Sequence, residues 1–188
     1  MSGPSINRAE SSGDIWTPWE FIHAVERTFN QPLVVDLAAS GKQSAKAPMF
    51  ITPEQDSLKW DWVQLYEENR LGVSGALWLN PPYSNITPWA KKCANTYVFD
   101  EQVEIFLLTP ASVGANWFWD YVWDYATVYS VGRMVFDNCF DRKTGLLVST
   151  VYPKDLILAH YTNTTPSRTL QRWQWKKAPL AQEAGAGG

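Results

Sequence analysis

The fold is decided by the stretch Ala76-Leu77-Trp78-Leu79-Asn80-Pro81-Pro82-Tyr83, in which a short apolar run stops abruptly at two prolines. Gly75 precedes the run, and an apolar run between chain breakers is typical of a buried β-strand. A residue before proline is pushed into an extended conformation. We therefore expect Asn80 at the C-terminal end of this strand, with its side chain held in a fixed direction.

The end of this strand is rich in hydrogen-bond acceptors. Neither proline has an N–H group, and each has φ near about −65°, so the turn presents rigid carbonyl oxygens. The Asn80 side chain adds an amide oxygen, and Tyr83 adds an aromatic ring. Such a site fits a planar amino group on an aromatic base. Taken alone, these residues are equally compatible with a rigid turn that places Tyr83 in the core, or with a short proline-motif ligand.

The composition indicates one globular domain without a membrane anchor. The 188 residues are enough for a single α/β domain. No apolar run approaches the ~18 residues of a transmembrane helix, and no signal peptide is recognisable. We therefore expect a soluble intracellular protein. The two cysteines, Cys93 and Cys139, have no metal-ligand spacing, so no metal site is predicted.

The charge distribution along the chain is uneven. The net charge of −3 argues against an obvious nucleic-acid-binding protein. Half of the 16 Lys and Arg residues, but only four of the 19 Asp and Glu residues, follow residue 130. A basic C-terminal third is suited to facing phosphates. On charge alone, a solvated tail explains the pattern equally well.

Strands alternate with helices along the first 131 residues, which predicts a parallel sheet with right-handed crossovers. Thr17 and Glu20 have the spacing of a capping box around Pro18, so a helix is expected to begin there. Asp56 is a candidate N-cap for a segment that extends to Asn69. The expected helices are 18–29, 87–97 and 116–125, and the expected extended segments are 33–36, 50–53, 76–79, 103–108, 127–131, 135–136, 146–151 and 156–161.

The closely spaced strands after residue 132 predict an antiparallel end to this sheet. The predicted fold class is therefore α/β, with a mostly parallel sheet and antiparallel C-terminal strands. Composition predicts a disordered N-terminus over 1–13 and a flexible tail over 176–188. The residues between them, 14–175, are expected to form a single domain.

A second group of candidate ligand-binding residues follows the strand at 33–36. Asp36 ends that strand, and the small residues after it let a ligand approach the backbone closely. An Asp in this position is also common as a turn or helix cap. Because parallel strands end at the same edge of a sheet, we expect Asp36 and Asn80 to border one crevice.

Basic residues of the C-terminal third are candidates for contact with nucleic acid. We expect Arg133 either to contact a phosphate or to pair with a nearby acid such as Asp137. The other cations alternate with Trp173 and Trp175, a spacing suited to phosphate and stacking contacts, and a disordered basic tail is the alternative. These other cations include Arg168, Arg172 and Lys176.

The motifs form an ordered series that resembles the phage-type DNA N-6-adenine methyltransferase (Dam) family over about residues 16–152. The resemblance implies a Rossmann-like class I fold that uses S-adenosylmethionine as the methyl donor. It also implies that DNA is the substrate. The motifs are Trp16-Thr17-Pro18, Asp36-x-Ala38-Ala39, Phe50-x-Thr52, Asp56-x-Leu58, Asn80-Pro81-Pro82-Tyr83-Ser84, Leu108-x-Pro110-Ala111 and Gly132-Arg133-x-x-Phe136.

The resemblance also implies roles for these residues. Asn80, Pro81, Pro82 and Tyr83 are expected to hold a flipped-out adenine, with Ser84 and the C-terminal cations on the DNA side. In this arrangement the Asn80 amide oxygen and the Pro81 carbonyl accept the two hydrogens of the adenine amine, and Tyr83 stacks on the base. The residues expected near the cofactor are Trp16, Thr17, Pro18, Asp36, Ala38, Ala39, Asp56 and Leu58.

The implied activity is site-specific methylation of the exocyclic N6 amino group of adenine, as in phage DNA modification that protects against restriction. One alternative is methylation of an RNA base or of a protein glutamine amide, which requires the same acceptors. Another is a nucleic-acid-binding protein without catalytic activity. We expect DNA as partner, a monomer or weak dimer, no membrane association, and the cytoplasm of a bacterial host cell as the location.

Overall fold

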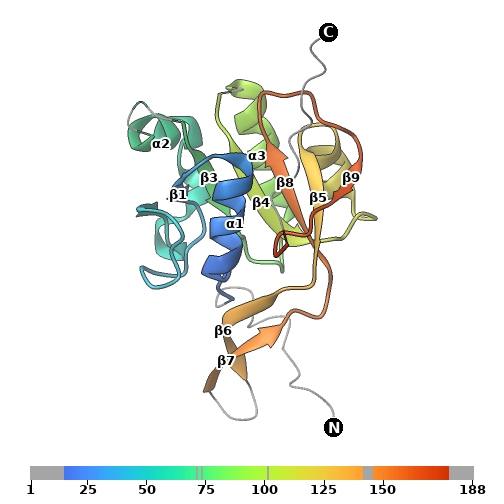
Figure 1. The fold of residues 1–188 in the computed structure, drawn as a ribbon. Coiled ribbons are helices and arrows are strands. Elements are labelled where there is room, and N and C mark those ends of the chain that lie inside the picture. The colour runs from blue at the N-terminus through green and yellow to red at the C-terminus, as the bar shows by residue number, and fades with distance from the viewer. Residues whose placement is uncertain (1–14, 71, 73, 101, 142–145, 178–188) are drawn as a thin grey trace.

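The computed structural model describes residues 15–177, except for 71, 73, 101 and 142–145. Its main feature is a seven-stranded sheet with the order β2-β1-β3-β4-β8-β5-β9 (Figure 1). All neighbours pair in parallel except β8, which is antiparallel to β4 and β5. This confirms the predicted α/β class and the mostly parallel sheet. The strands are β1 (Leu33–Asp36), β2 (Met49–Phe50), β3 (Ala76–Leu79), β4 (Ile105–Pro110), β5 (Thr127–Gly132), β8 (Leu156–Tyr161) and β9 (Leu170–Arg172).

Helices cover both faces of the sheet (Figure 1), as strands that are apolar on both sides require. On one face, α1 (Trp19–Phe29) buries Phe21 and Ile22 in a cluster with Trp78 and Phe106. Leu77 and Leu79 belong to the cluster on the other face, because side chains alternate along a strand. The helices of that face are α2 (Trp62–Asn69), α3 (Thr87–Phe99), α4 (Asn116–Phe118) and the π-helix η3 (Trp119–Trp123).

The start of α1 differs from the prediction. The helix begins at Trp19, with Pro18 at the N-cap and no side-chain hydrogen bond to the first turn. The capping role predicted for Thr17 is therefore wrong. Its hydroxyl group instead accepts a hydrogen bond from the Asn80 side chain at 3.1 Å, a tertiary contact that outweighs the local preference for a cap.

Two other helices also depart from the prediction. α2 begins after Asp61, whose carboxylate accepts hydrogen bonds from the first backbone N–H groups of the helix, so the predicted Asp56 cap is wrong. Asp56 itself has a left-handed backbone, with φ of 52°, between the short 3₁₀ helices η1 (Pro53–Gln55) and η2 (Ser57–Lys59). The helix predicted over 116–125 is one α-helical turn followed by a π-helix.

The strands β6 (Val135–Asp141) and β7 (Leu146–Val151) form a separate antiparallel hairpin that projects from the body of the molecule (Figure 1). The prediction that they extend the main sheet is therefore wrong, whereas β8 does join it in antiparallel orientation. Gly132 has φ of 70°, a conformation that glycine adopts without strain, at the point where the chain leaves β5.

The C-terminal segment belongs to the core, which the sequence did not indicate. Trp173 is 2 % exposed and packs against Phe21, Phe29 and Tyr129, so its predicted stacking on nucleic acid is wrong. β9 was also missed, and it pairs in parallel with β5. The segment predicted to be disordered, 1–13, lies outside the described residues, as does the tail after residue 177.

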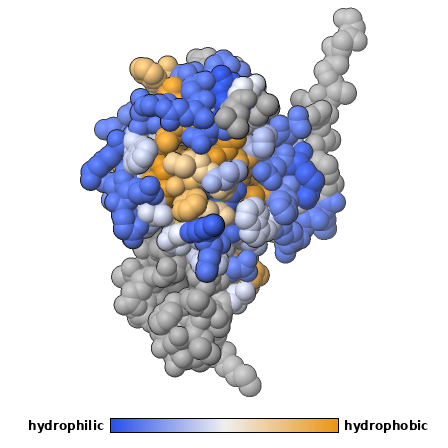
Figure 2. Space-filling view, turned by 90° about the vertical axis from the view of Figure 1, so that its left-hand side faces the viewer, coloured by the Kyte–Doolittle hydropathy of each residue, from blue (hydrophilic) through white to orange (hydrophobic). Residues whose placement is uncertain are grey.

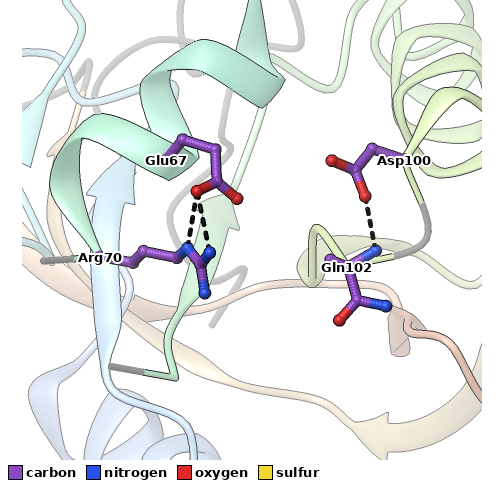
Figure 3. A network of polar contacts seen from close by, with 4 residues as sticks. All are labelled: Glu67, Arg70, Asp100 and Gln102. Carbon is purple, nitrogen blue, oxygen red and sulfur yellow. Dashed lines mark hydrogen bonds and ion pairs between the residues drawn. The ribbon is translucent and has the colours of Figure 1, made fainter. Parts of the chain in front are cut away.

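Two local polar contacts lie in the segments that precede β3 and β4 (Figure 3). These segments lead into the amino ends of the two strands, whereas Asn80 follows the carboxyl end of β3. Arg70 donates from Nε and Nη2 to the Glu67 carboxylate at 3.0 and 2.9 Å. The Asp100 carboxylate accepts from the backbone N–H of Gln102 at 2.9 Å. Over the part of the chain that the structure describes, no helix has the length and apolar character needed to cross a membrane.

Candidate active site

The candidate site lies at the carboxyl ends of the parallel strands, where the strand order reverses. β1 has β2 on one side and β3 on the other, and open α/β sheets bind ligands in the crevice at such a point. A cavity of about 1140 Å³ opens there, and both Asp36 and Asn80 line it. Most small-molecule pockets measure about 300–1,000 Å³. The cavity is therefore slightly larger than a usual small-molecule pocket.

The topology divides the cavity wall into two halves, with residues 80–83 between them. The β1 half consists of the loops after β1 and β2, residues 37–46 and 51–57. The β4 half consists of the segment after β4 and the segment before β8, residues 110–117 and 152–154. Apolar residues gather in the middle of the face that carries α2 and β1, within a largely hydrophilic surround (Figure 2).

The Asn80 amide has a defined orientation. Its Nδ2 group donates to the Thr17 hydroxyl at 3.1 Å and to the Ile15 carbonyl at 3.4 Å. Its Oδ1 atom is shielded from solvent and accepts a hydrogen bond from none of the described residues. A buried acceptor without a donor costs about 1–3 kcal/mol. A ligand that brings an amino group to Oδ1 recovers that free energy.

The turn after Asn80 holds the other predicted acceptors and the aromatic ring. The Pro82 carbonyl accepts from the backbone N–H of Asn85 at 3.4 Å, whereas the Pro81 carbonyl has no such partner among the described residues. The rings of Tyr83 and Tyr152 pack edge to face, with 5.4 Å between their centroids. Its hydroxyl is buried without a partner in the described structure, and burial raises the pKa of Tyr83 well above its ordinary value.

Asp36 organises the loop of the β1 half. Its two carboxylate oxygens accept hydrogen bonds from the backbone N–H groups of Ala38 and Lys46, at 3.1 and 2.9 Å. The side chain is 4 % exposed, and this burial raises the pKa of Asp36 from 3.8 to about 6, although the two hydrogen bonds and the charge of Lys46 oppose the shift. Asp36 therefore closes a turn, one of the two alternatives left open by the sequence, and it also lines the cavity, whereas ligand binding by Asp36 stays a prediction.

Comparison with known proteins agrees with this geometry. The family model described as DNA N-6-adenine-methyltransferase (Dam) matches residues 6–172. The chain belongs to the Dam family. A relative named DNA N-6-adenine-methyltransferase, from Haemophilus phage HP1 (strain HP1c1), is 33 % identical over 113 residues, which are 60 % of this chain and 58 % of the relative. The chain thus spans less than two thirds of that relative's length. No solved structure matches it.

The remaining residues that the Dam resemblance placed near the cofactor are only partly brought together. Trp16, Thr17, Ala38, Ala39 and Asp56 line the cavity. Pro18 and Leu58 do not line the cavity. Pro18 is the N-cap residue of α1, and Leu58 packs against the core.

Asp56 reaches the cavity as an ionised group. Its carboxylate is 2.9 Å from the ammonium group of Lys59, and this hydrogen bond lowers the pKa of Asp56. The loop that carries it is fixed from α3, because the Lys92 ammonium group donates to the carbonyls of Leu58 and Trp60 at 3.0 and 2.7 Å. A hydrogen bond from the backbone of Leu58 also lowers the pKa of Asp56.

Lys46 was missed at the sequence level. It lines the cavity and is 5 % exposed, and its ammonium group lies 4.7 Å from the centre of the Trp19 ring. Burial lowers the pKa of Lys46, an effect that the charges of Asp36 and Asp137 oppose. A lysine ten residues after Asp36 carries no sequence signal of its own, because the contact depends on how the loop folds back. No cluster suited to a metal ion occurs among the described residues.

The predicted DNA-contacting residues separate into two groups. Ser84 lines the cavity, and Arg133 lies near its mouth, since its Nε is 3.6 Å from the carboxylate of Asp155, which follows the wall residue Lys154. The remaining cations lie just before, on or just after the edge strand β9, which is four strands away from β3, and they are outside the cavity wall. These are Arg168, which pairs with Asp124 at 3.1 Å, Arg172 on β9, and Lys176, which lies 5.0 Å from the Trp175 ring.

Proposed function

We propose that this protein transfers a methyl group from S-adenosylmethionine to the N6 amino group of adenine in DNA. The observation that carries the proposal is Asn80, which lines a cavity of about 1140 Å³ and whose buried Oδ1 atom has no donor among the described residues. Membership of the Dam family supports the choice of adenine N6 among the amino groups that such an acceptor can bind.

The fold supports a Rossmann-like class I methyltransferase. The sheet is parallel except for one strand near its end, helices cover both faces, and the site occupies the point of strand-order reversal. This is the position at which nucleotide-like ligands meet open α/β sheets. We therefore assign the cofactor to the β1 half and the adenine to the β4 half.

The β1 half has the groups that S-adenosylmethionine requires. Ala38 and Ala39 have small side chains, which lets the cofactor approach the loop that Asp36 closes. Asp56, ionised and only partly exposed, is suited to accept hydrogen bonds from the ribose hydroxyl groups. Lys46 supplies a buried positive charge for the carboxylate of the methionine tail.

Asn80 and Pro81 are assigned to the reacting amine. When bound, the cofactor supplies an electrophilic methyl group on a sulfonium. Transfer to N6 would form the C–N bond as the cofactor's S–C bond breaks, leaving S-adenosylhomocysteine, and the methylated amine would then pass one proton to water. Asn80 Oδ1 and the Pro81 carbonyl accept the two amine hydrogens and stabilise the positive charge that develops on nitrogen. This aims the lone pair at the methyl group.

DNA approaches the β4 half. An adenine inside a duplex is out of reach, so the base must leave the helix at a cost of a few kcal/mol. Stacking on Tyr83 returns about 1–3 kcal/mol. Ser84, Lys154 and Arg133 lie at or beside this part of the cavity and are assigned to the flanking backbone. Arg168, Arg172 and Lys176 do not line the cavity, so contact between them and DNA stays a prediction.

The test is mass spectrometry of nucleosides from DNA incubated with S-adenosylmethionine and the purified protein. Wild-type protein should produce N6-methyladenine, and Asn80→Ala should reduce the rate by about a hundredfold or more while leaving cofactor affinity within a factor of about two. Asn69→Ala, at the end of α2 and outside the cavity, is the matched control. Unmodified DNA, together with methylated RNA or protein glutamine, would reject the proposal in favour of those substrates.

A further inference from the structure

The segment immediately before α1 lies across the site. Residues 15–17, here called the strap, contact three separate parts of the fold. The backbone of Trp16 exchanges two hydrogen bonds of 3.0 Å with Asp137 at the base of the β6–β7 hairpin. The Trp16 indole donates to the Ser40 hydroxyl at 3.2 Å, in the loop after β1. Ile15 and Thr17 provide the two acceptors for the Asn80 amide.

The strap determines which side of the Asn80 amide faces the cavity. A carbonyl oxygen can only accept hydrogen bonds, so the Ile15 carbonyl requires the –NH2 side of the amide to face the strap. The Thr17 hydroxyl, at 3.1 Å, can either accept or donate, so it holds the amide in place while the Ile15 carbonyl selects the orientation. A rotation of the amide by half a turn would bring two oxygens together at the strap and would present –NH2 donors to the amine of the base. That orientation cannot accept the amine hydrogens.

The burial of Thr17 strengthens its effect on Asn80. The residue is 2 % exposed, so water cannot replace its hydroxyl as the acceptor. Thr17 lies one position before the N-cap Pro18, so its hydroxyl serves Asn80 without competing with a helix cap.

We propose that Thr17 is a positioning residue, which holds the Asn80 amide in the orientation that the Ile15 carbonyl selects, so that Oδ1 can accept a hydrogen from the adenine amine. This inference rests on the proposed function and changes the role that the Dam resemblance implied for Thr17, which was contact with the cofactor. The hydroxyl acts through Asn80 and does not touch either substrate.

The test compares Thr17→Val, which keeps the shape of the side chain and removes the acceptor, with Thr17→Ser, which keeps the hydroxyl. Single-turnover methylation at saturating S-adenosylmethionine should be about tenfold slower for Thr17→Val, the loss expected for one positioning hydrogen bond. The dissociation constant for the cofactor should stay within about twofold. Thr17→Ser should restore most of the rate, and Thr96→Val, a buried threonine on α3 away from the cavity, should match wild type.

A double-mutant cycle with Asn80→Ala separates positioning from a general effect on folding. If Thr17 acts through Asn80, Thr17→Val should slow the wild-type protein but not the Asn80→Ala variant. Equal slowing in both backgrounds would overturn the proposal. So would a Thr17→Val variant that methylates at the wild-type rate, or one that binds the cofactor much more weakly at an unchanged saturated rate. Absence of N6-methyladenine with wild-type protein would instead refute the proposed function, and this role of Thr17 with it.

Discussion

Replacing Asp36 by Asn should change how the stability of the protein depends on pH. Burial raises the pKa of Asp36 from 3.8 to about 6 in the folded state. Between these two values the folded state binds more protons than the unfolded state, so the contribution of Asp36 to stability falls as the pH rises. The shift of about two units corresponds to about 3 kcal/mol, because one unit is about 1.4 kcal/mol. This stability is present below pH 3.8 and lost by about pH 7.

The assay is urea unfolding of wild type and Asp36→Asn at several pH values from 4 to 7, followed by tryptophan fluorescence. An asparagine side chain has only one oxygen for the backbone N–H groups of Ala38 and Lys46. The lost hydrogen bond lowers the free energy of unfolding by an amount that does not vary over this pH range. The variant should therefore gain about 2.5 kcal/mol relative to wild type between pH 4 and 7, most of the full shift. Other carboxylates titrate equally in both proteins and cancel in the difference.

Asp56→Asn is the matched control for this experiment. The hydrogen bond from Lys59 lowers the pKa of Asp56, and the side chain is partly exposed. Its contribution to stability is therefore lost as the pH falls, the opposite direction to that of Asp36. If the difference between wild type and Asp36→Asn is flat from pH 4 to 7, or has the same sign as the control, the burial of an ionised Asp36 is not what sets its behaviour.

Three further substitutions test individual parts of the structure. Tyr83→Phe removes a buried hydroxyl without a described partner and keeps the stacking face, so the melting temperature should hold or rise and methylation should persist; a large loss of rate would give the hydroxyl a catalytic role. Lys46→Met should raise the dissociation constant for S-adenosylmethionine at least about tenfold at a nearly unchanged saturated rate, and unchanged calorimetric affinity would contradict its assignment. Trp173→Ala should cost about 3–5 kcal/mol in urea unfolding, far more than Trp175→Ala, and equal small losses would mean that the C-terminal segment is not part of the core.

The central strand and the acceptors after it could be predicted from the sequence because local rules determine them. An apolar run that ends in Asn80-Pro81-Pro82 has few alternatives, since proline restricts both itself and the residue before it. The same argument placed Asp36 at the end of a neighbouring strand, and parallel strands bring the two ends to one edge. Residues at strand ends were therefore located correctly before any tertiary contact was known.

Predictions failed where a tertiary contact replaces a local preference. Thr17 has the sequence context of a helix cap, but its hydroxyl bonds to Asn80, 63 residues away. Trp173 lies in a basic stretch that looks like a tail, yet it fills space between α1 and β5. Lys46 depends on the path of a loop closed by Asp36. None of these contacts has a periodicity or spacing that the sequence could reveal.

Several features that reduce stability occur at the carboxyl end of the sheet. Asn80 has a buried acceptor without a described donor, Asp36 is desolvated, and α1 begins without a side-chain cap. At the opposite end, Glu67 and Asp100 have ordinary paired contacts, but Gln31 also has a buried side-chain oxygen without a described donor. Natural proteins depart from local rules mainly where function requires it. Binding of an amine at Oδ1 removes one of these unfavourable features, so substrate should stabilise the fold at the same atom at which it is oriented for reaction.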